Sequence, residues 1–331
     1  MYKAAIIGCG RIAGLNDDPN SDSISTHAKA YRNNDRTNLV CAADVDQERL
    51  GRFGSIWSVE KLYLDYRDML SGERPDIVSI CTSNSAHYDI LKYIAVTGGT
   101  RLVFCEKPMT LSVEQAEEIV RLYSEKNILL AVNHTRQWEP GHERIKEFIK
   151  QGGIGKIQKV TCYYYKGIVH NGVHLLDYLL DVLGKPRSAH VLGTMEEPDE
   201  DMTLDAFLVF DEGVSCYIIG LDKQYYDVFE MDFMGTEGRI RIDDFGQIFR
   251  YWNREQNPLA GGDIELIEKP LGFESEYRYA MSYTVRNLVE ALDGKGKLKC
   301  DGGKALEVLK IVLWLKSLVS SNFKSNYDLE G

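Results

Sequence analysis

A glycine-containing turn directly follows a short apolar run at the start of the chain. The run Ala4–Ile7 leads into Gly8–Ala13, which reads GCGRIA. In this pattern the first glycine makes a tight turn, the second lets backbone N–H groups approach a pyrophosphate, and the small third residue lets a helix pack on the strand. A helix that starts there would direct the positive end of its dipole at the anion. The turn predicts a dinucleotide site, and the alternative is a glycine-rich turn without a ligand. The residues expected against the cofactor are Gly8, Gly10, Arg11 and Ile12.

The first 133 residues alternate apolar, strand-like runs with amphipathic, helix-like runs. Short continuous apolar runs are typical of parallel strands that are covered on both faces. Alternating βα units predict a doubly wound parallel sheet, the Rossmann arrangement. The expected strands are Ala4–Ile7, Leu39–Ala43, Ile77–Cys81, Leu102–Cys105 and Ile128–Val132, and the expected helices are His27–Asn33, Gln47–Phe53, Ala86–Thr97 and Val113–Lys126, the last with Ser112 and Gln115 as a capping box.

An acidic residue, Asp44, closes the second expected strand. A carboxylate in this place can accept hydrogen bonds from the adenosine ribose and repel a 2′-phosphate, and no basic residue follows until Arg49. The sequence therefore predicts NAD as the cofactor. The spacing from the glycine turn is longer than usual because a polar stretch, Asn16–Ser25, intervenes. A turn or helix N-cap role is the alternative for Asp44.

Polar and charged residues also follow the third and fourth expected strands, at the rim where ligands bind in such sheets. Among them the residues expected to bind the cofactor are Thr82, Asn84, His87, Glu106 and Lys107. Thr82, Asn84 and His87 follow the run Ile77–Cys81, although capping of the next helix by Asn84 or Ser85 explains that segment equally well. Glu106 and Lys107 follow the run Leu102–Cys105. Because Pro108 favours an extended Lys107, the ammonium should project at the rim and can hydrogen-bond a substrate hydroxyl. An ordinary loop is the alternative.

The chain changes character after about residue 134. Helices are expected at Trp138–Gln151 and Val173–Leu183, then strands with period-two alternation around Phe229–Phe233 and Arg239–Asp243, and a hairpin over Leu204–Gly220 that turns at Asp211–Gly213. Two helices, Tyr277–Leu292 and Lys304–Ser320, should close the chain, and Glu196–Asp201 and Asn253–Asp263 should be loops. The second part is therefore predicted to be an α+β domain with an open, mainly antiparallel sheet. The domains are expected at 1–133 and 134–331.

The helix from Val173 carries a group of ionisable residues on one face. His174, Asp177 and Asp181 recur at three- and four-residue spacing, opposite an apolar face. A histidine that titrates near neutrality suits general acid–base chemistry. A structural histidine is the alternative.

The bulk composition excludes several partners. The net charge is −11, and nucleic acids or anionic membranes would require a basic surface. No apolar run is long enough to span a membrane, and no signal peptide is apparent. The seven cysteines lie mostly in strand-like runs without any CxxC pair, which favours buried thiols and a cytoplasmic location. No metal site is expected.

Taken together, the motifs resemble the glucose–fructose oxidoreductase/inositol dehydrogenase family (Gfo/Idh/MocA) over essentially the whole chain. Ser83 departs from the proline usual in the family, and His170 stands where the inositol dehydrogenase type carries aspartate. The residues that carry the resemblance are GCGRIA at 8–13, His27, Asp44, TSNSAH at 82–87, Glu106-Lys107-Pro108, NHTRQWEP at 133–140, Gly172, His174 and Asp177, and DGGKALEVL at 301–309.

The resemblance implies an NAD-linked oxidoreductase that acts on a hydroxyl or keto carbon of a sugar, cyclitol or nucleotide-linked sugar. It implies that Lys107 is the catalytic lysine, that His174 donates and accepts the proton, that Asp177 lies at the edge of the pocket, and that the protein forms dimers or tetramers. Arg136 and Tyr165 are candidate pocket residues, although the tyrosine run around Tyr165 is equally explained by strand packing.

His170 is hypothesised to face the pocket and to share the proton relay or contact the substrate; a position in the preceding loop, facing solvent, is the alternative. The rival function is a sensor or regulatory protein of the same fold that binds the dinucleotide without turnover.

Overall fold

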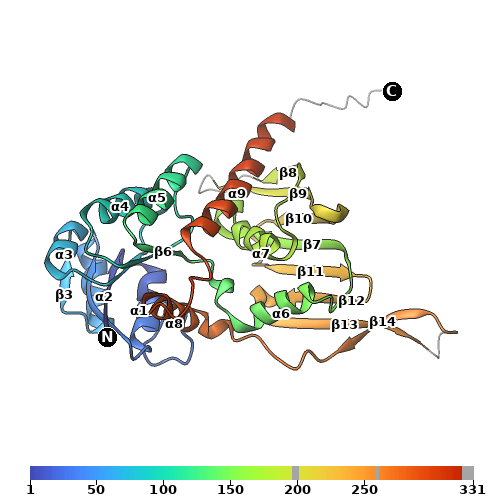
Figure 1. Cartoon of the computed structure of the whole chain (residues 1–331), viewed down its shortest axis with the longest axis horizontal. Helices are drawn as coiled ribbons and strands as arrows, with labels where there is room; N and C mark the ends of the chain where they lie inside the picture. The colour runs from blue at the N-terminus through green and yellow to red at the C-terminus, as the bar shows by residue number, and fades with distance from the viewer. Residues whose placement is uncertain (196–200, 258–260, 323–331) are drawn as a thin grey trace. The chain divides into compact units, whose positions relative to one another are not determined.

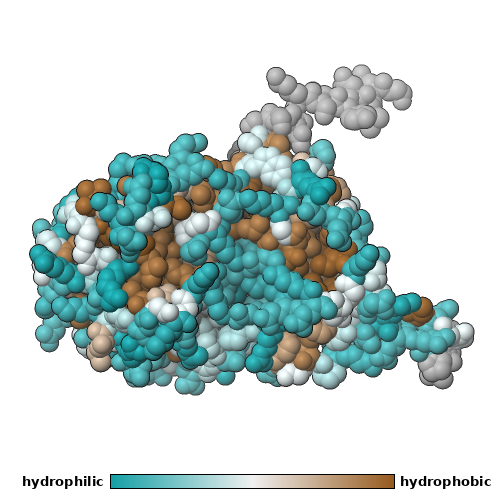
Figure 2. Space-filling model, viewed as in Figure 1, coloured by the Kyte–Doolittle hydropathy of each residue, from teal (hydrophilic) through white to brown (hydrophobic). Residues whose placement is uncertain are grey.

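The structure is a computed structural model that describes residues 1–195, 201–257 and 261–322, and it contains two compact units. The first unit comprises Met1–Glu139 and Arg278–Glu307, and the second comprises Pro140–Tyr277 and the chain from Val308 onward. None of the helices within the described residues combines the length and apolar character needed to cross a bilayer. Figure 2 shows hydrophilic residues over most of one face, with hydrophobic residues exposed in separate patches.

A parallel sheet forms the centre of the first unit, as predicted, and it has six strands because β3 joins the five that the sequence indicates (Figure 1). Its strand order is β3-β2-β1-β4-β5-β6, and all neighbouring pairs are parallel. The order reverses between β1 and β4, and ligands bind outside the carboxyl ends of the strands at such a reversal. The strands are β1 (Tyr2–Ile7), β2 (Thr37–Ala43), β3 (Lys61–Tyr63), β4 (Ile77–Ile80), β5 (Leu102–Cys105) and β6 (Leu129–Val132).

Helices connect and cover these strands. Helix α4 packs against α5, and α1 packs against α8. The predicted cap of α5 is confirmed, because Ser112 Oγ accepts a 3.2 Å hydrogen bond from the Gln115 N–H. The helices of this unit are α1 (His27–Arg32), α2 (Gln47–Trp57), α3 (Tyr66–Glu73), α4 (Asn84–Thr97), α5 (Val113–Glu125) and α8 (Ala280–Leu292).

The second unit contains an eight-stranded sheet that is antiparallel except between β7 and β10. This confirms the predicted open, mainly antiparallel sheet. The predicted hairpin is present as β9 and β10, and Gly213 in its turn has a φ of +75°. The strands are β7 (Ile157–Tyr165), β8 (Ser188–Met195), β9 (Thr203–Val209), β10 (Ser215–Leu221), β11 (Glu230–Gly235), β12 (Gly238–Asp243), β13 (Ile248–Gln256) and β14 (Ile264–Lys269), in the order β14-β13-β12-β11-β7-β10-β9-β8.

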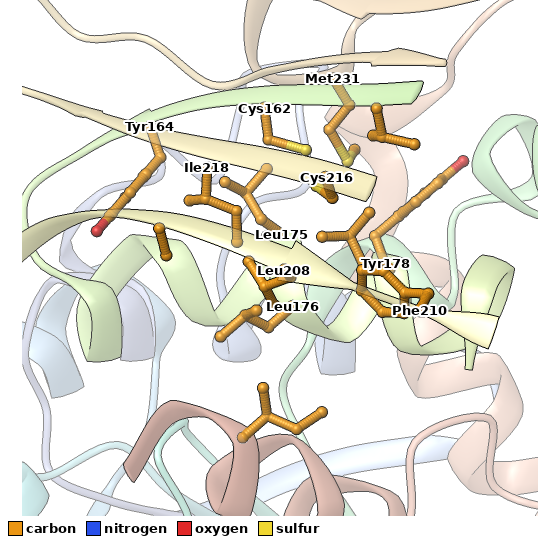
Figure 3. Close-up of a cluster of buried hydrophobic side chains, with 14 of the residues drawn as sticks. Cys162, Tyr164, Leu175, Leu176, Tyr178, Leu208, Phe210, Cys216, Ile218 and Met231 are labelled. Atoms are coloured by element: carbon orange, nitrogen blue, oxygen red, sulfur yellow. The ribbon is translucent and has the colours of Figure 1, made fainter. Parts of the chain in front are cut away.

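One face of this sheet is covered by helices and forms the core of the second unit. The helices are α6 (Pro140–Lys150), α7 (Val173–Leu183) and the part of α9 (Gly302–Asn322) that follows Val308. Figure 3 shows Leu175, Leu176 and Tyr178 of α7 among side chains of β7, β9, β10 and β11. Each fully buried aliphatic or aromatic side chain of this kind contributes roughly 1.5–3 kcal/mol to folding. This core fixes α7, the helix that carries His174.

Several local predictions differ from the structure. Strand β3 and helix α3 were not predicted, because their residues mix polar and apolar types without a clear period. The prediction of a loop at Asn253–Asp263 is wrong at its start, because strand β13 continues to Gln256. Residues 258–260 of this segment lie outside the described residues. Of the loop expected at Glu196–Asp201, residues 196–200 also lie outside the described residues.

The first compact unit extends beyond residue 133. The Trp138 indole packs against Phe104 with ring centroids 6.0 Å apart, and its Nε1 donates a 2.9 Å hydrogen bond to Asn287. Met281 and Leu288 of α8 belong to the buried core of the first unit. The segments 134–139 and 278–307, placed by sequence in the second domain, are therefore packed with the first sheet. The functional roles assigned to the two domains remain predictions.

The Asn16–Ser25 insertion is an ordered loop in this unit. Asp17 accepts hydrogen bonds from the Ser25 N–H, the Ser25 hydroxyl and the Thr26 hydroxyl, at 2.7 to 3.0 Å. The buried Lys29 ammonium donates to the carbonyl oxygens of Asp18 and Ser21. The Ile24 N–H donates to the carbonyl of Arg278. Side chains and backbone of the unit thus hold the loop in place.

Candidate active site

The turn after β1 has the geometry that the sequence predicts. Gly8 has a φ of +87°, and a Cβ built there would lie 2.7 Å from backbone atoms of Cys81 and Thr82. Only glycine fits this position, because the turn lies directly against the end of β4. A Cβ at Gly10 would meet nothing within 4 Å, so the backbone there is open to an approaching ligand.

The segment after this turn is shorter than a typical dinucleotide-binding helix. Arg11–Leu15 forms a single π-helical turn, and α1 begins only at His27. A helix of one turn has a small dipole, so the expected dipole contribution to anion binding is small here. Hydrogen bonds from backbone N–H groups must therefore contribute most of the binding of the anion. The Arg11 guanidinium donates a 3.0 Å hydrogen bond to Asn16, which directs its side chain to the insertion loop.

A cavity of about 470 Å³ lies at the carboxyl ends of β1, β2 and β4, where the strand order reverses. Its volume and position suit part of a dinucleotide. Four predicted cofactor residues line it, namely Gly8, Gly10, Asp44 and Thr82. The other residues predicted to bind the cofactor, which are not part of this lining, are Arg11, Ile12, Asn84, His87, Glu106 and Lys107.

Asp44 is almost fully buried at the end of β2 and accepts four hydrogen bonds. Its Oδ2 accepts from the Cys9 N–H at 2.7 Å and from Arg49 Nε at 2.9 Å. Its Oδ1 accepts from the Asp46 N–H at 2.9 Å and from Arg49 Nη2 at 2.8 Å. Burial raises the pKa of the Asp44 carboxyl, but the hydrogen bonds from Arg49 and from the two N–H groups outweigh it, so the pKa lies below its ordinary value. Asp44 thus lines the cavity and ties the glycine turn to β2.

The alternatives raised for the polar segments are partly resolved. The N-cap of α2 is Asp46, whose carboxylate accepts from the Arg49 N–H, so Asp44 is a turn residue but not the cap. Helix α4 starts at Asn84 with Ser83 as its N-cap, so neither Asn84 nor Ser85 caps it. Asn84 is exposed in the first helical position.

His87 is fully buried between two backbone segments. Its Nδ1 lies 2.8 Å from the carbonyl oxygen of Pro108, and its Nε2 lies 3.2 Å from that of Thr82. The ring therefore joins the loop after β4 to the loop after β5. These contacts indicate a positioning role next to the rim.

Glu106 lies at the end of β5 in a network of buried polar groups. Its Oε1 is 2.8 Å from His27 Nε2 and accepts a 2.7 Å hydrogen bond from the Asn133 amide. Burial raises the pKa of the Glu106 carboxyl, but hydrogen bonds from His27 and Asn133 and the positive charge of Lys107 outweigh it and lower the pKa below its ordinary value. Glu106 is thus held as a carboxylate. The next residue, Lys107, is half-buried at the rim, and its peptide bond to Pro108 is cis.

The remaining candidate in the first unit is Arg136. It lies in the short 3₁₀ turn Thr135–Gln137 after β6 and is 5% exposed. The carboxyl ends of β5 and β6 therefore bring Glu106, Lys107 and Arg136 into one region of this unit.

The candidates His170, His174 and Asp177 of the second unit occupy one continuous helical stretch. A π-helical turn, Ile168–Gly172, leads without a break into α7, so the helix does extend back through His170. His170 is exposed, His174 is half-buried, and Asp177 is 2% exposed. Tyr165 lies at the end of β7, half-buried, with its ring edge-on to Phe245.

Asp201 holds the start of this helical stretch. Its carboxylate accepts hydrogen bonds from the backbone N–H groups of His170, at 2.7 Å, and Val169, at 3.1 Å. A Cβ at Gly167 would lie 2.1 Å from the same carboxylate, so glycine is required beside it.

Sequence reasoning missed several of these residues. Tyr66 and Arg67 line the cavity from α3, a helix that was not predicted, and Arg49 was noted only as the first basic residue after Asp44. The His27–Glu106 pair and the Asp201 contacts join residues distant in sequence. The sequence signal that could have found Arg49 is its short spacing from Asp44, which lets the two side chains meet at the connection between β2 and α2.

Comparisons with known proteins agree with this geometry. Residues 2–134 match the family model described as "Oxidoreductase family, NAD-binding Rossmann fold". The chain is 29% identical to D-apiose dehydrogenase of Paraburkholderia graminis over 46% of its length, and this match spans only 38% of that relative. It is 25% identical to an uncharacterized oxidoreductase of Bacillus subtilis over 92% of this chain and 91% of that one.

A solved structure shows the same fold over nearly the whole chain. It is the WlbA dehydrogenase of Bordetella pertussis in complex with NADH and UDP-GlcNAcA, with a TM-score of 0.80 and 19% identity, covering 97% of this chain and 96% of that one. The match confirms the predicted two-part fold.

Proposed function

Because residues 2–134 match the model of an NAD-binding oxidoreductase family, we propose that the chain is a Gfo/Idh/MocA oxidoreductase, an NAD-dependent dehydrogenase or reductase of sugars, cyclitols or nucleotide-linked sugars. The reaction is the transfer of a hydride between the nicotinamide and a hydroxyl or keto carbon. Named relatives with partial matches include D-apiose dehydrogenase and myo-inositol 2-dehydrogenase. They support a polyhydroxylated substrate without selecting one.

The cavity at the strand reversal is the observation that carries this proposal. It combines Gly8, which only glycine can occupy, the open backbone at Gly10, and the carboxylate of Asp44. A dinucleotide needs a close backbone approach for its pyrophosphate, which the open turn at Gly10 offers. It also needs polar groups for its ribose, which the cavity offers as Asp44 together with its ion-pair partner Arg49. The bound dinucleotide would supply the hydride donor or acceptor.

Lys107 and His174 are the proposed catalytic residues. The Lys107 ammonium would hydrogen-bond the reacting hydroxyl and favour its alkoxide, and His174 would take the hydroxyl proton during oxidation and return it during reduction. Positioned acid–base groups of this kind contribute roughly 10²–10⁴-fold to the rate, or about 3–5 kcal/mol. Glu106 is a charged neighbour of Lys107, whose positive charge helps to lower the pKa of the Glu106 carboxyl.

The substrate is proposed to contact Lys107, Arg136, Tyr165, His170 and Asp177. These side chains provide hydroxyl, guanidinium, ammonium, imidazole and carboxylate groups, which can pair with the donors and acceptors of a polyol.

The test is a substrate screen with purified protein, NAD and NADH, and panels of sugars, cyclitols and nucleotide-linked sugars. Formation or loss of reduced nicotinamide is followed by its absorbance. Turnover of at least one polyhydroxylated substrate would support the proposal. Tight NAD binding without turnover of any of them would favour the sensor function instead.

We also propose that the protein is a homo-oligomer. The face of the second sheet opposite its helices has exposed apolar side chains, including Leu192, Tyr217 and Met234. Tyr217 and Phe207 lie side by side on adjacent strands, with ring centroids 4.9 Å apart. An exposed apolar surface of this kind is typical of an interface. Light scattering coupled to size-exclusion chromatography tests the proposal, and a monomer at micromolar concentration would contradict it.

A further inference from the structure

The cavity at the strand reversal has a guanidinium group where the sequence alone indicates only a carboxylate. Arg49, in the first turn of α2, lines this cavity and donates two hydrogen bonds to Asp44 in a fork, from Nε and Nη2. Its side chain is 41% exposed, whereas that of Asp44 is 4% exposed. The group that a ligand meets at this point is therefore an ion pair with its cationic partner outermost.

The Asp44 carboxylate has no unused acceptor position in this arrangement. A carboxylate offers about four positions for hydrogen-bond donors. Those of Asp44 are filled by the Cys9 N–H, the Asp46 N–H and two N–H groups of Arg49. A ribose diol can be accepted by Asp44 only if Arg49 gives up its place.

A second guanidinium lines the same cavity. Arg67, in the first turn of α3, lies over the ring of Tyr66 at 4.8 Å and 5.6 Å from the ring centre of Tyr93. Its Nη1 also lies 3.3 Å from Asp65 Oδ2, and these contacts orient the group while 55% of the side chain stays exposed. The cavity lining contains two arginines, Arg49 and Arg67, and two aspartates, Asp44 and Asp89. Their formal charges cancel, so the cavity does not repel an anion.

We propose that Arg49, supported by Arg67, binds the 2′-phosphate of NADP(H) at the ribose end of this cavity, so that the protein accepts NADP as well as NAD. This inference rests on the proposed function, because it assumes that the adenosine half of a dinucleotide occupies the cavity. Arg49 uses two of its five N–H donors on Asp44 and can direct others to a phosphate, a group that arginine binds in a forked geometry. The electrostatic repulsion between the Asp44 carboxylate and a 2′-phosphate is offset by the Arg49 guanidinium that covers the carboxylate.

The experiment compares two probes that differ by one phosphate, 5′-AMP and 2′,5′-ADP, by isothermal titration calorimetry on the whole protein. NAD and NADP are titrated in parallel. The variants are Arg49→Ala, Arg49→Lys and Arg67→Ala. Arg52→Ala is the matched control, because Arg52 is exposed on the same helix and is not part of the cavity lining. Circular dichroism checks that each variant is folded.

The wild-type protein should bind 2′,5′-ADP at least as tightly as 5′-AMP. Arg49→Ala should weaken the binding of 2′,5′-ADP by about tenfold or more, as expected for a lost charge-assisted hydrogen bond. The affinity of this variant for 5′-AMP should stay within about threefold of the wild-type value. Arg49→Lys should bind 2′,5′-ADP more tightly than Arg49→Ala does. Arg67→Ala should lose less of the affinity for 2′,5′-ADP than Arg49→Ala loses, and Arg52→Ala should bind both probes as the wild type does.

Two results would overturn the inference and leave the proposed function intact. One is tenfold weaker binding of 2′,5′-ADP than of 5′-AMP to the wild-type protein. The other is an equal loss of affinity for both probes in Arg49→Ala, which would show that Arg49 contacts the adenosine or stabilises the turn at Asp44. If neither probe nor either dinucleotide binds the folded wild-type protein, the proposed function fails as well.

Discussion

His27 Nε2 lies 2.8 Å from Glu106 Oε1, although the two residues are 79 positions apart. The other ring nitrogen, Nδ1, lies 2.8 Å from the Ser79 hydroxyl, and the ring packs on Phe104. A fully buried histidine thus links the first helix to the strand end that precedes Lys107.

We predict that His27→Phe lowers the free energy of unfolding of the first unit by about 1–3 kcal/mol. The substitution keeps an aromatic ring beside Phe104 but removes a partner from the buried Glu106 and Ser79. Urea unfolding followed by circular dichroism measures the effect. Tyr31→Phe, which removes a single hydroxyl contact to Ser79, should lower the free energy of unfolding by less than His27→Phe does. Equal stability of His27→Phe and the wild type would show that the network does not stabilise the fold.

Lys107→Ala and His174→Ala should each reduce turnover by at least about 10²-fold, in the range for groups that transfer or polarise a proton. Folding and NAD affinity should be retained, because neither residue lines the cavity at the strand reversal. Steady-state kinetics and NAD titration measure the two properties separately. Turnover near that of the wild type in either variant would remove that residue from the mechanism.

His170→Asn tests whether the exposed histidine one turn before His174 takes part in the chemistry. If it does, the pH–rate profile should lose one limb between about pH 5 and 8, where histidine ordinarily changes charge. The measurement is kcat/KM against pH for the variant and the wild type. An unchanged profile with unchanged kcat/KM would assign the chemistry to Lys107 and His174 without His170.

Asp201→Ala should destabilise the helical turn that carries His170 by about 1 kcal/mol, because two backbone N–H groups lose a carboxylate acceptor. Hydrogen exchange at Val169 and His170 should become faster. Asp201→Asn retains an oxygen acceptor and should show a smaller change. If Asp201 also positions the histidines, kcat should fall in Asp201→Ala while NAD affinity stays constant. Unchanged exchange in Asp201→Ala would argue against this anchoring role.

Asp293 should make stability depend on pH in the acid range. Hydrogen bonds from Tyr2 and Arg36 lower the pKa of its carboxyl from 3.8 to about 2. A carboxyl whose pKa is lower in the folded than in the unfolded state stabilises the fold above its unfolded pKa, and loses this contribution as the pH falls through its folded pKa. Asp293→Asn should therefore be less stable than the wild type at pH 7, and the difference should shrink from about pH 4 towards pH 2. Urea midpoints across this range test it, and a constant difference would contradict it.

The sequence predicted those features that depend on neighbouring residues. Gly8 could be assigned because its turn requires a positive φ, and Asp44 because it ends an apolar strand. The helix cap at Ser112 and the hairpin turn at Gly213 are local in the same way. Each of these is decided by a few residues whose conformational preferences agree with the fold.

The sequence did not predict the features that depend on tertiary contacts. Strand β3 has only three residues and lies at the edge of its sheet, so it lacks the apolar run that marks the inner strands. Without β3 and α3, the position of Arg67 on the cavity could not be inferred. The single π-helical turn at Arg11–Leu15 was also missed, because a dinucleotide motif ordinarily precedes a longer helix.

The composition of the first unit from two separate segments has a consequence for synthesis on the ribosome. Its sixth strand ends at Val132, yet α8, which supplies part of its buried core, begins only at Ala280, and Ala131 also forms a bridge with Asp301. At translation rates of about 5–20 residues per second, the nascent first segment waits on the order of ten seconds for that helix. During this interval the apolar surface that will receive Met281 and Leu288 is exposed. The second unit, whose whole sheet is encoded between these two segments, can begin to form before the first one is complete.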